Sequence, residues 1–91
     1  MIDVKKFGEV LTSRPAGKEA YLSAKAYILP KNAAEAVVLD FKGVKVLSPS
    51  WADEFVTPLQ REFTNVQLIN TENSSVKATL ETIAQFAHQR N

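Results

Sequence analysis

A short, unbroken apolar run in the middle of the chain constrains the fold more than any other feature of the sequence. The run Ala36-Val37-Val38-Leu39-Asp40-Phe41 is too short for a helix, and continuous apolar character is typical of a strand buried on both faces in a parallel sheet. Parallel strands cannot be joined by a tight hairpin and need long crossover connections, usually helices. The run therefore predicts the central strand of an α/β fold.

The first third of the chain supplies another strand and a helix. Residues Ile2–Phe7 alternate apolar and polar side chains, which predicts a strand whose direction in the sheet stays open. Ser13 can cap a following helix that Pro30 closes. Gly17 is the weak point of this helix, because glycine in a helix interior costs up to about 1 kcal/mol relative to alanine. The apolar face of the helix consists of Ala20, Ala24, Tyr27 and Ile28.

A second helix is predicted after the central strand. Ser48 and Ser50 are both candidate N-caps, and Ser50 also has the spacing of a capping box to Asp53. From Trp51 to Phe63 apolar residues recur at helical spacing. Pro58 is expected to kink or break this helix, because proline lacks the amide hydrogen that an interior turn needs.

The last third of the chain supplies a strand and a helix again. Val66–Ile69 is a short apolar run between two asparagines and predicts a strand. Ser74 or Ser75 can cap the last helix. The apolar face of that helix consists of Val76, Leu80, Ile83, Ala84 and Ala87. The order β-α-β-α-β-α predicts a single α/β domain over residues 1–91, with a mostly parallel sheet covered by helices.

Composition excludes several classes of function. Ninety-one residues are enough for one hydrophobic core, and eleven basic against ten acidic residues give a net charge of only +1. No overall field therefore draws the chain to nucleic acid or to an anionic membrane, and no apolar stretch approaches the roughly 20 residues that span a bilayer. The absence of cysteine excludes disulfides and thiolate metal sites and fits a reducing compartment. We expect a cytoplasmic protein that binds neither nucleic acid nor membranes.

Residues that could carry catalysis are scarce. His88 is the only histidine, lies close to the end of the sequence, and is expected to be solvated. The three glycines do not form a phosphate-binding motif. We do not expect a catalytic centre that is built only from residues such as Asp40, Ser50, Asp53 or Glu54. The sequence predicts no enzyme activity, no metal and no cofactor.

Three carboxylates are nevertheless candidates for binding a partner. Asp40 follows the central strand, at the edge where open α/β sheets place their sites, although a carboxylate that accepts loop amides would explain it as well. Asp53 and Glu54 begin the next helix, where the exposed amides and the helix dipole stabilise negative side chains without any further role.

The same loop and helix carry two serines and a tryptophan. Ser48 and Ser50 lie at the mouth of the helix, where they can act as caps or expose a hydroxyl to which a phosphate could be added. Trp51 is the only tryptophan and does not lie on the apolar face of its helix. It is either core packing or an exposed aromatic anchor for a partner.

The segment from Val38 to Glu54 resembles the STAS-like domain family, whose members carry a pattern like LDFxGVxxISPSFADE. Phe7-Gly8 and the segment Leu11–Arg14 resemble the opening motif of that family, and Ile69-Asn70 resembles the end of its last strand. The resemblance covers nearly the whole chain. It implies the small α/β fold that the apolar patterns also predict.

The family is related to the STAS domains of bacterial anti-sigma factor antagonists, in which a kinase phosphorylates a serine at a helix N-terminus and thereby breaks partner binding. By position, Asp40 matches the strand-end aspartate of those domains and Ser50 matches the phosphorylated serine, whereas Pro49, Trp51 and Asp53 depart from the antagonist motif. The resemblance implies a partner such as a histidine-kinase-like ATPase or an anti-sigma factor.

The resulting hypothesis is a regulatory protein-interaction module. It would bind its partner through the loop 43–50 and the following helix, with Trp51 as the anchor and phosphorylation of Ser50 as a switch. The alternative is a structural domain that self-associates and uses no switch. The sequence leaves the oligomeric state open.

Overall fold

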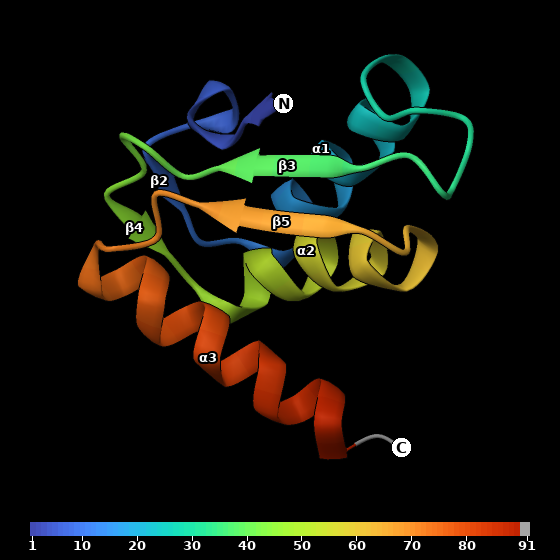
Figure 1. The fold of residues 1–91 in the computed structure, drawn as a ribbon. Helices are drawn as coiled ribbons and strands as arrows, with labels where there is room; N and C mark the ends of the chain where they lie inside the picture. Colours follow the sequence, from blue (N-terminus) through green and yellow to red (C-terminus); the bar gives the residue numbers. More distant parts are fainter. Residues whose placement is uncertain (90–91) are drawn as a thin grey trace.

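The computed structural model describes the backbone of residues 1–89 and the side chains of residues 1–85. The expectations for Ala87 and His88 therefore lie outside the described side chains. The elements in chain order are β1 (Ile2–Asp3), a 3-10 helix η1 (Val4–Phe7), β2 (Val10–Leu11), α1 (Arg14–Tyr27), β3 (Val37–Asp40), β4 (Val46–Leu47), α2 (Pro49–Glu62), β5 (Val66–Ile69) and α3 (Ser74–Gln89). Figure 1 shows their arrangement. No helix among the described residues has the length and apolar character that crossing a membrane requires.

The strands form two small parallel ladders. The larger sheet has the order β1-β3-β5, so that β3 is central, and β2 pairs with β4 in a separate ladder. All three strand pairs are parallel. The first strand, whose direction the sequence left open, therefore runs parallel to β3. The α/β class and the mostly parallel sheet are thus confirmed.

The first strand is much shorter than the alternation of Ile2–Phe7 predicts. Asp3 pairs with Asp40, where β3 ends, and no partner strand continues beyond that point. The chain therefore leaves the sheet and forms η1, which buries Val4 completely and half-buries Phe7. It then returns to a strand only at Val10, where β4 offers a new partner.

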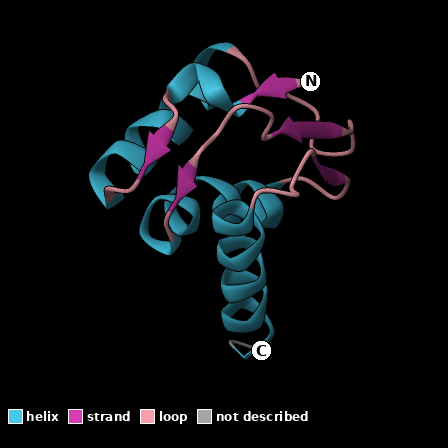
Figure 2. Cartoon of the chain, turned by 90° about the vertical axis from the view of Figure 1, so that its left-hand side faces the viewer, coloured by secondary structure: helices cyan, strands magenta, loops and turns pink. Residues whose placement is uncertain are grey.

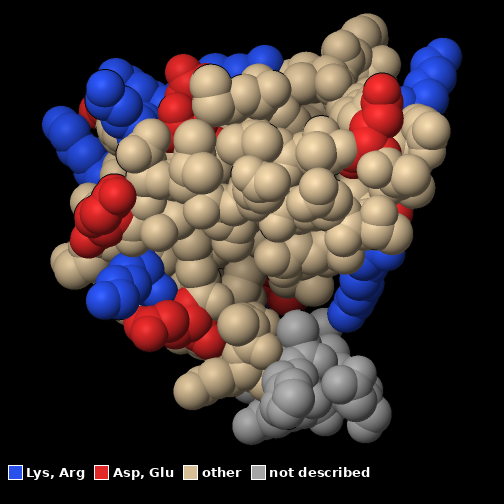
Figure 3. Space-filling model, viewed as in Figure 1, with Lys and Arg blue, Asp and Glu red and all other residues tan. Residues whose placement is uncertain are grey.

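The sheet is covered on one face only, which corrects the expectation of a strand buried on both faces. Val37 and Leu39 are buried, whereas Val38 and Asp40, which point to the opposite side, are partly exposed. All three α-helices lie on the same side of the sheet (Figures 1 and 2). Figure 3 shows the open face, where uncharged residues occupy a broad central area and charged side chains gather at the margins.

The core lies between the sheet and the helices. Its largest fully buried side chains are Trp51, Phe41, Phe55, Leu39, Leu47 and Leu59. The helix α2 contributes three of these residues and continues through Pro58 to Glu62, so the predicted break does not occur. Burial of the α2 face outweighs the roughly 3 kcal/mol that an interior proline costs.

The helices are held together by close backbone contacts and by caps. A Cβ on Gly17 would lie 2.6 Å from the carbonyl oxygen of Trp51, so glycine allows α1 and α2 to approach each other. The last helix is capped by Asn73, whose Oδ1 accepts from the amides of Ser75 (2.8 Å) and Val76 (3.2 Å), and not by Ser74 or Ser75. The hydroxyls of Ser75 and of Thr79 instead bind the backbone of Leu47 in β4.

Candidate functional site

Two strand–helix units lie side by side at one end of the molecule. The unit β2–α1 and the unit β4–α2 pair through their strands, with Val10 opposite Val46 and Leu11 opposite Leu47. In each unit a serine caps the helix: Ser13 Oγ accepts from the Ala16 amide at 3.1 Å, and Ser48 does the same for α2. The two helices therefore begin next to each other. The predicted loop 43–50 leads into this region, but it is not a continuous loop, because it contains β4 and the first two residues of α2.

Ser48 is the cap of α2 and also connects the two units. Its Oγ accepts from the Trp51 amide at 3.3 Å and donates to the Thr12 carbonyl at 2.7 Å. Ser50 is the second residue of the helix and is partly exposed, so the capping box predicted between Ser50 and Asp53 does not form. Both serines are partly exposed, and Ser48 is the one whose hydroxyl caps the helix.

Trp51 is not an exposed anchor. Only 1% of its surface is accessible, and its ring stacks on Phe55 with the ring centroids 4.9 Å apart. Phe7 packs against both rings, with centroid distances of 6.2 Å to Trp51 and 5.3 Å to Phe55. The first turn of α2 is covered by η1 and α1, so a residue outside the regular apolar stripe of the helix still points into the core. Of the two interpretations of Trp51, the exposed anchor is therefore wrong and core packing is confirmed.

Asp53 and Glu54 are brought together by a residue of the neighbouring helix. One guanidinium nitrogen of Arg14 lies 3.0 Å from Asp53 Oδ2 and 2.6 Å from Glu54 Oε2. These two hydrogen bonds, that to Asp53 first, raise the pKa of Arg14 above its ordinary value. Both carboxylates are partly exposed, so that together with Arg14 they form a charged surface patch on the first turns of α1 and α2.

Asp40 joins a different set of residues. Its Oδ1 accepts from Asn70 Nδ2 at 2.8 Å and from the Lys42 amide at 2.9 Å, and the bond from Asn70 is the main reason why the pKa of Asp40 is lowered. Asn70 has a positive φ of 56°. The carboxylate thus ties the ends of β3 and β5 to each other.

A cavity of about 500 Å³ lies at the same end of β3 and β5. It is lined by Phe41, Lys42, Gly43, Val44, Lys45, Asn70, Glu72 and Asn73. Among the described residues, no three side chains of His, Cys, Asp or Glu gather as a metal site requires.

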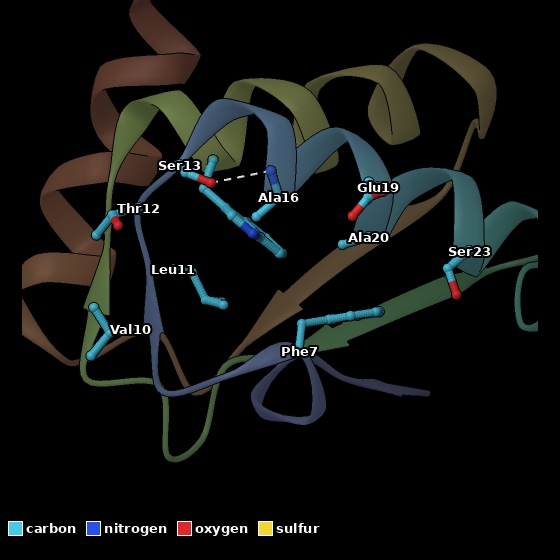
Figure 4. A pocket seen from close by; sticks show the side chains of 10 residues that line it. Phe7, Val10, Leu11, Thr12, Ser13, Ala16, Glu19, Ala20 and Ser23 are labelled. Carbon is cyan, nitrogen blue, oxygen red and sulfur yellow. Dashed lines mark hydrogen bonds between the residues drawn. The ribbon is translucent and has the colours of Figure 1, made fainter.

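A second, smaller cavity lies between the N-terminal segment and α1 (Figure 4). It has a volume of about 350 Å³, with Phe7 and Trp51 among its aromatic walls and Glu19 and Ser23 on the side of α1. Val10 lies at one end of it. The cavity is bounded by both polar and apolar side chains.

The sequence reasoning missed two exposed valines. Val10 and Val46 are 62% and 40% exposed, and they are direct partners in the β2–β4 ladder. The repeated pattern Val-Leu before a helix-capping serine, at residues 10–13 and 46–48, was a signal that could have indicated them. The pair forms an apolar spot that includes Val46 of the segment 43–50.

The comparison with protein families gives one match. The family model described as a STAS-like domain of unknown function (DUF4325) matches residues 25–77, which is more than half of the chain. The match includes β3, β4, α2 and β5 and every candidate site residue from Asp40 to Glu54. The comparisons with curated proteins and with solved structures found no significant match. The chain therefore belongs to the family of STAS-like domains of unknown function.

Proposed function

We propose that this chain is a regulatory protein-interaction module of the cytoplasm, without catalytic activity of its own, that binds a protein partner through the loop 43–50 and the start of α2. The observation that carries the proposal is the exposed pair Val10 and Val46, which gives this loop an apolar contact point in place of the buried Trp51. Apolar contacts surrounded by polar side chains are the usual composition of a protein interface.

Charged and polar groups around the valines support the same surface. Glu9 and Lys45 form an ion pair at 3.5 Å, and Arg14 on α1 pairs with Asp53 and Glu54 on α2, so both sets of charges connect the two units. Ser48 binds the backbone of Thr12 between β2 and α1, and Asp40 ties the end of β3 to Asn70 after β5. The resemblance to anti-sigma factor antagonists points to a histidine-kinase-like ATPase or an anti-sigma factor as the class of partner.

We further propose that phosphorylation of Ser50 controls binding. A phosphate on the second residue of α2 would lie near the free amides of the helix N-terminus, which favour negative charge. It would also add a charge of about −1.5 to −2 next to Asp53 and Glu54, which Arg14 only partly compensates, and so change the charge of the surface.

The switch is tested by the intact mass of the chain after incubation with its partner kinase. An added phosphate that is absent from Ser50→Ala supports the switch, and an unmodified wild-type chain contradicts it. Ser50→Glu is expected to weaken binding of the partner.

The binding surface is tested with the purified chain as bait in a lysate of its source organism. We expect a protein that is retained by the wild type and by Leu22→Asp but lost by Val46→Asp. Leu22 is the matched control because it is a similarly exposed aliphatic residue, 55% exposed, on α1. Circular dichroism of the variants checks that they are folded. Retention that does not depend on Val46 would contradict the proposed surface.

A self-associating structural domain is the second candidate function. It is favoured by the uncharged central area of the open face of the sheet (Figure 3). By strand alternation and register, the partly exposed Val38 and Ile69 point to this face. Light scattering over a range of protein concentrations tests it. A mass that rises above the monomer supports self-association, and a constant monomer mass contradicts it.

A further inference from the structure

The strand β5 has one unpaired edge. It lies at the end of the sheet order β1-β3-β5, and among the described residues no strand pairs with its other side. The Val37 amide donates to the Asn65 carbonyl and the Phe41 amide donates to the Ile69 carbonyl, at 2.9 and 3.1 Å. Alternate residues of β5 therefore bond to β3, and the amide and carbonyl groups of Val66 and Leu68 point to the open edge.

A groove runs beside this edge. It has a volume of about 290 Å³ and is lined by Leu68, Thr71, Lys77, Leu80, Glu81 and Ala84. The helix α3 extends past the edge of the sheet and lies with the other helices rather than in the plane of the strands (Figures 1 and 2). A strand added to β5 would therefore have the side of α3 beneath it.

We propose that an extended segment of a partner protein adds to this edge as a fourth strand of the sheet. The free backbone groups of Val66 and Leu68 would supply its main-chain hydrogen bonds, and the groove would take alternate side chains. Leu68, Leu80 and Ala84 require these side chains to be aliphatic. This site is separate from the surface around Val46, so either proposal can fail without the other.

Charges on the rim of the groove define the segment further. Lys77 and Glu81 are exposed and have no ion-pair partner among the side chains that the structure describes. The segment is therefore expected to carry an acidic residue close to Lys77 and a basic residue close to Glu81. A second copy of the chain fits less well, because its own α3 would need the space that α3 already occupies beside β5.

Selection from a displayed library of random peptides tests the site. The peptides have about ten residues, enough to cover an edge strand of this length. We expect selected peptides with alternating aliphatic residues that bind the wild type and Ala78→Arg alike but lose about tenfold or more in affinity for Ala84→Arg. Both alanines are exposed on α3, and only Ala84 lines the groove. A selection without any peptide sensitive to Ala84→Arg would overturn the proposal.

Methylation of the peptide backbone separates strand addition from other modes of binding. Because only every second amide of an added strand can face β5, N-methylation is expected to abolish binding at alternate positions and to be tolerated between them. Exchanging the rim charges with Lys77→Glu and Glu81→Lys is expected to reverse the preference for charged residues in the peptide. A methylation scan without alternation counts against the site, and so do selected peptides that bind as a helix.

Discussion

Gly17 lies where the backbones of α1 and α2 come closest. Replacing it with alanine would raise the helix propensity of α1 by up to about 1 kcal/mol. The new methyl group, however, would meet the Trp51 carbonyl at 2.6 Å and the Trp51 Cα at 3.0 Å, both of them backbone atoms. We expect Gly17→Ala to lower the free energy of unfolding by about 1–3 kcal/mol in urea titrations, because overpacking outweighs propensity.

Ser23→Ala is the matched control for that change. Ser23 is an exposed residue of the same helix, and alanine there should leave stability unchanged or slightly raised. If Gly17→Ala were as stable as Ser23→Ala, the close approach of the two helices would be disproved.

Asp40 should make stability depend on pH. The bonds from Asn70 and from the Lys42 amide hold its pKa below the ordinary value of 3.8. Its stabilising contribution is therefore present above that value and is lost as the pH falls through the lower pKa of the folded state. We expect Asp40→Asn to be less stable than the wild type at neutral pH, and the difference to shrink as the solution is acidified below about pH 4.

Asn70→Gly provides a second measurement of the same contact. Glycine keeps the positive φ of Asn70 without strain but removes the hydrogen bond to Asp40. An NMR titration of the Asp40 carboxyl should then give a higher pKa than in the wild type. An unchanged pKa would show that the side-chain bond is not what lowers it.

At the scale of the elements, the start of α2 depends on one hydroxyl. Ser48 caps the helix and also donates to Thr12, whereas Ser50 lies inside the helix. We expect Ser48→Ala to cost about 1–2 kcal/mol of unfolding free energy and Ser50→Ala to change it by less than about 0.5 kcal/mol. Thermal unfolding of both variants measures the contrast, and equal effects would reject Ser48 as the cap.

The elements also show where sequence reasoning succeeds. The Ser13 cap of α1 and the strand β5 are confirmed as predicted, and β3 is confirmed without its two end residues. The helix α1 ends at Tyr27, before Pro30, and the side chain of Tyr27 is exposed and not on the buried face where it was predicted. Cap chemistry and short apolar runs act within a few residues, so the local sequence contains the necessary information. The strand predicted over Ile2–Phe7 is too long, because the length of β1 depends on how far its partner β3 extends. The alternation of apolar and polar residues contains no information about that partner.

At the scale of the whole molecule, stability depends on a small core centred on Trp51. The side chain is fully buried between Phe7 and Phe55, and truncating a buried aromatic residue to alanine costs about 3–5 kcal/mol. A domain of this size has a total stability near the lower end of about 5–15 kcal/mol. We expect Trp51→Ala to lose most of its cooperative unfolding in circular dichroism, and Trp51→Phe to remain folded with reduced stability.

The exposed Leu22 again provides the control, because Leu22→Ala should change stability by less than about 0.5 kcal/mol. A stable, cooperatively folded Trp51→Ala variant would contradict the central place of this residue in the core. The same result would restore Trp51 as a candidate for contact with a partner.

For the candidate site, as for the fold, the sequence predicts some features and leaves others open. The sequence identified the segment from Asp40 to Glu54 that the family model also matches, but it did not distinguish the roles of the residues within it. Arg14 pairs with Asp53 and Glu54, and Ser48 donates to the Thr12 carbonyl, across units that are 36 to 40 residues apart in the chain. The repeated Val-Leu pattern is present in the sequence, but only the pairing of β2 with β4 places Val10 and Val46 side by side.

The sequence by itself determined the α/β class, the alternation of β3, α2, β5 and α3, and the start of the first helix, because periodicity and capping act over a few neighbouring residues. It did not predict η1 or the two-residue strands β2 and β4. The tertiary structure alone decided that the helices cover one face of the sheet, that Trp51 points inward, that Asp40 binds Asn70 and that one edge of β5 stays open. Each of these depends on which distant segment packs against a residue, and no local pattern specifies that partner.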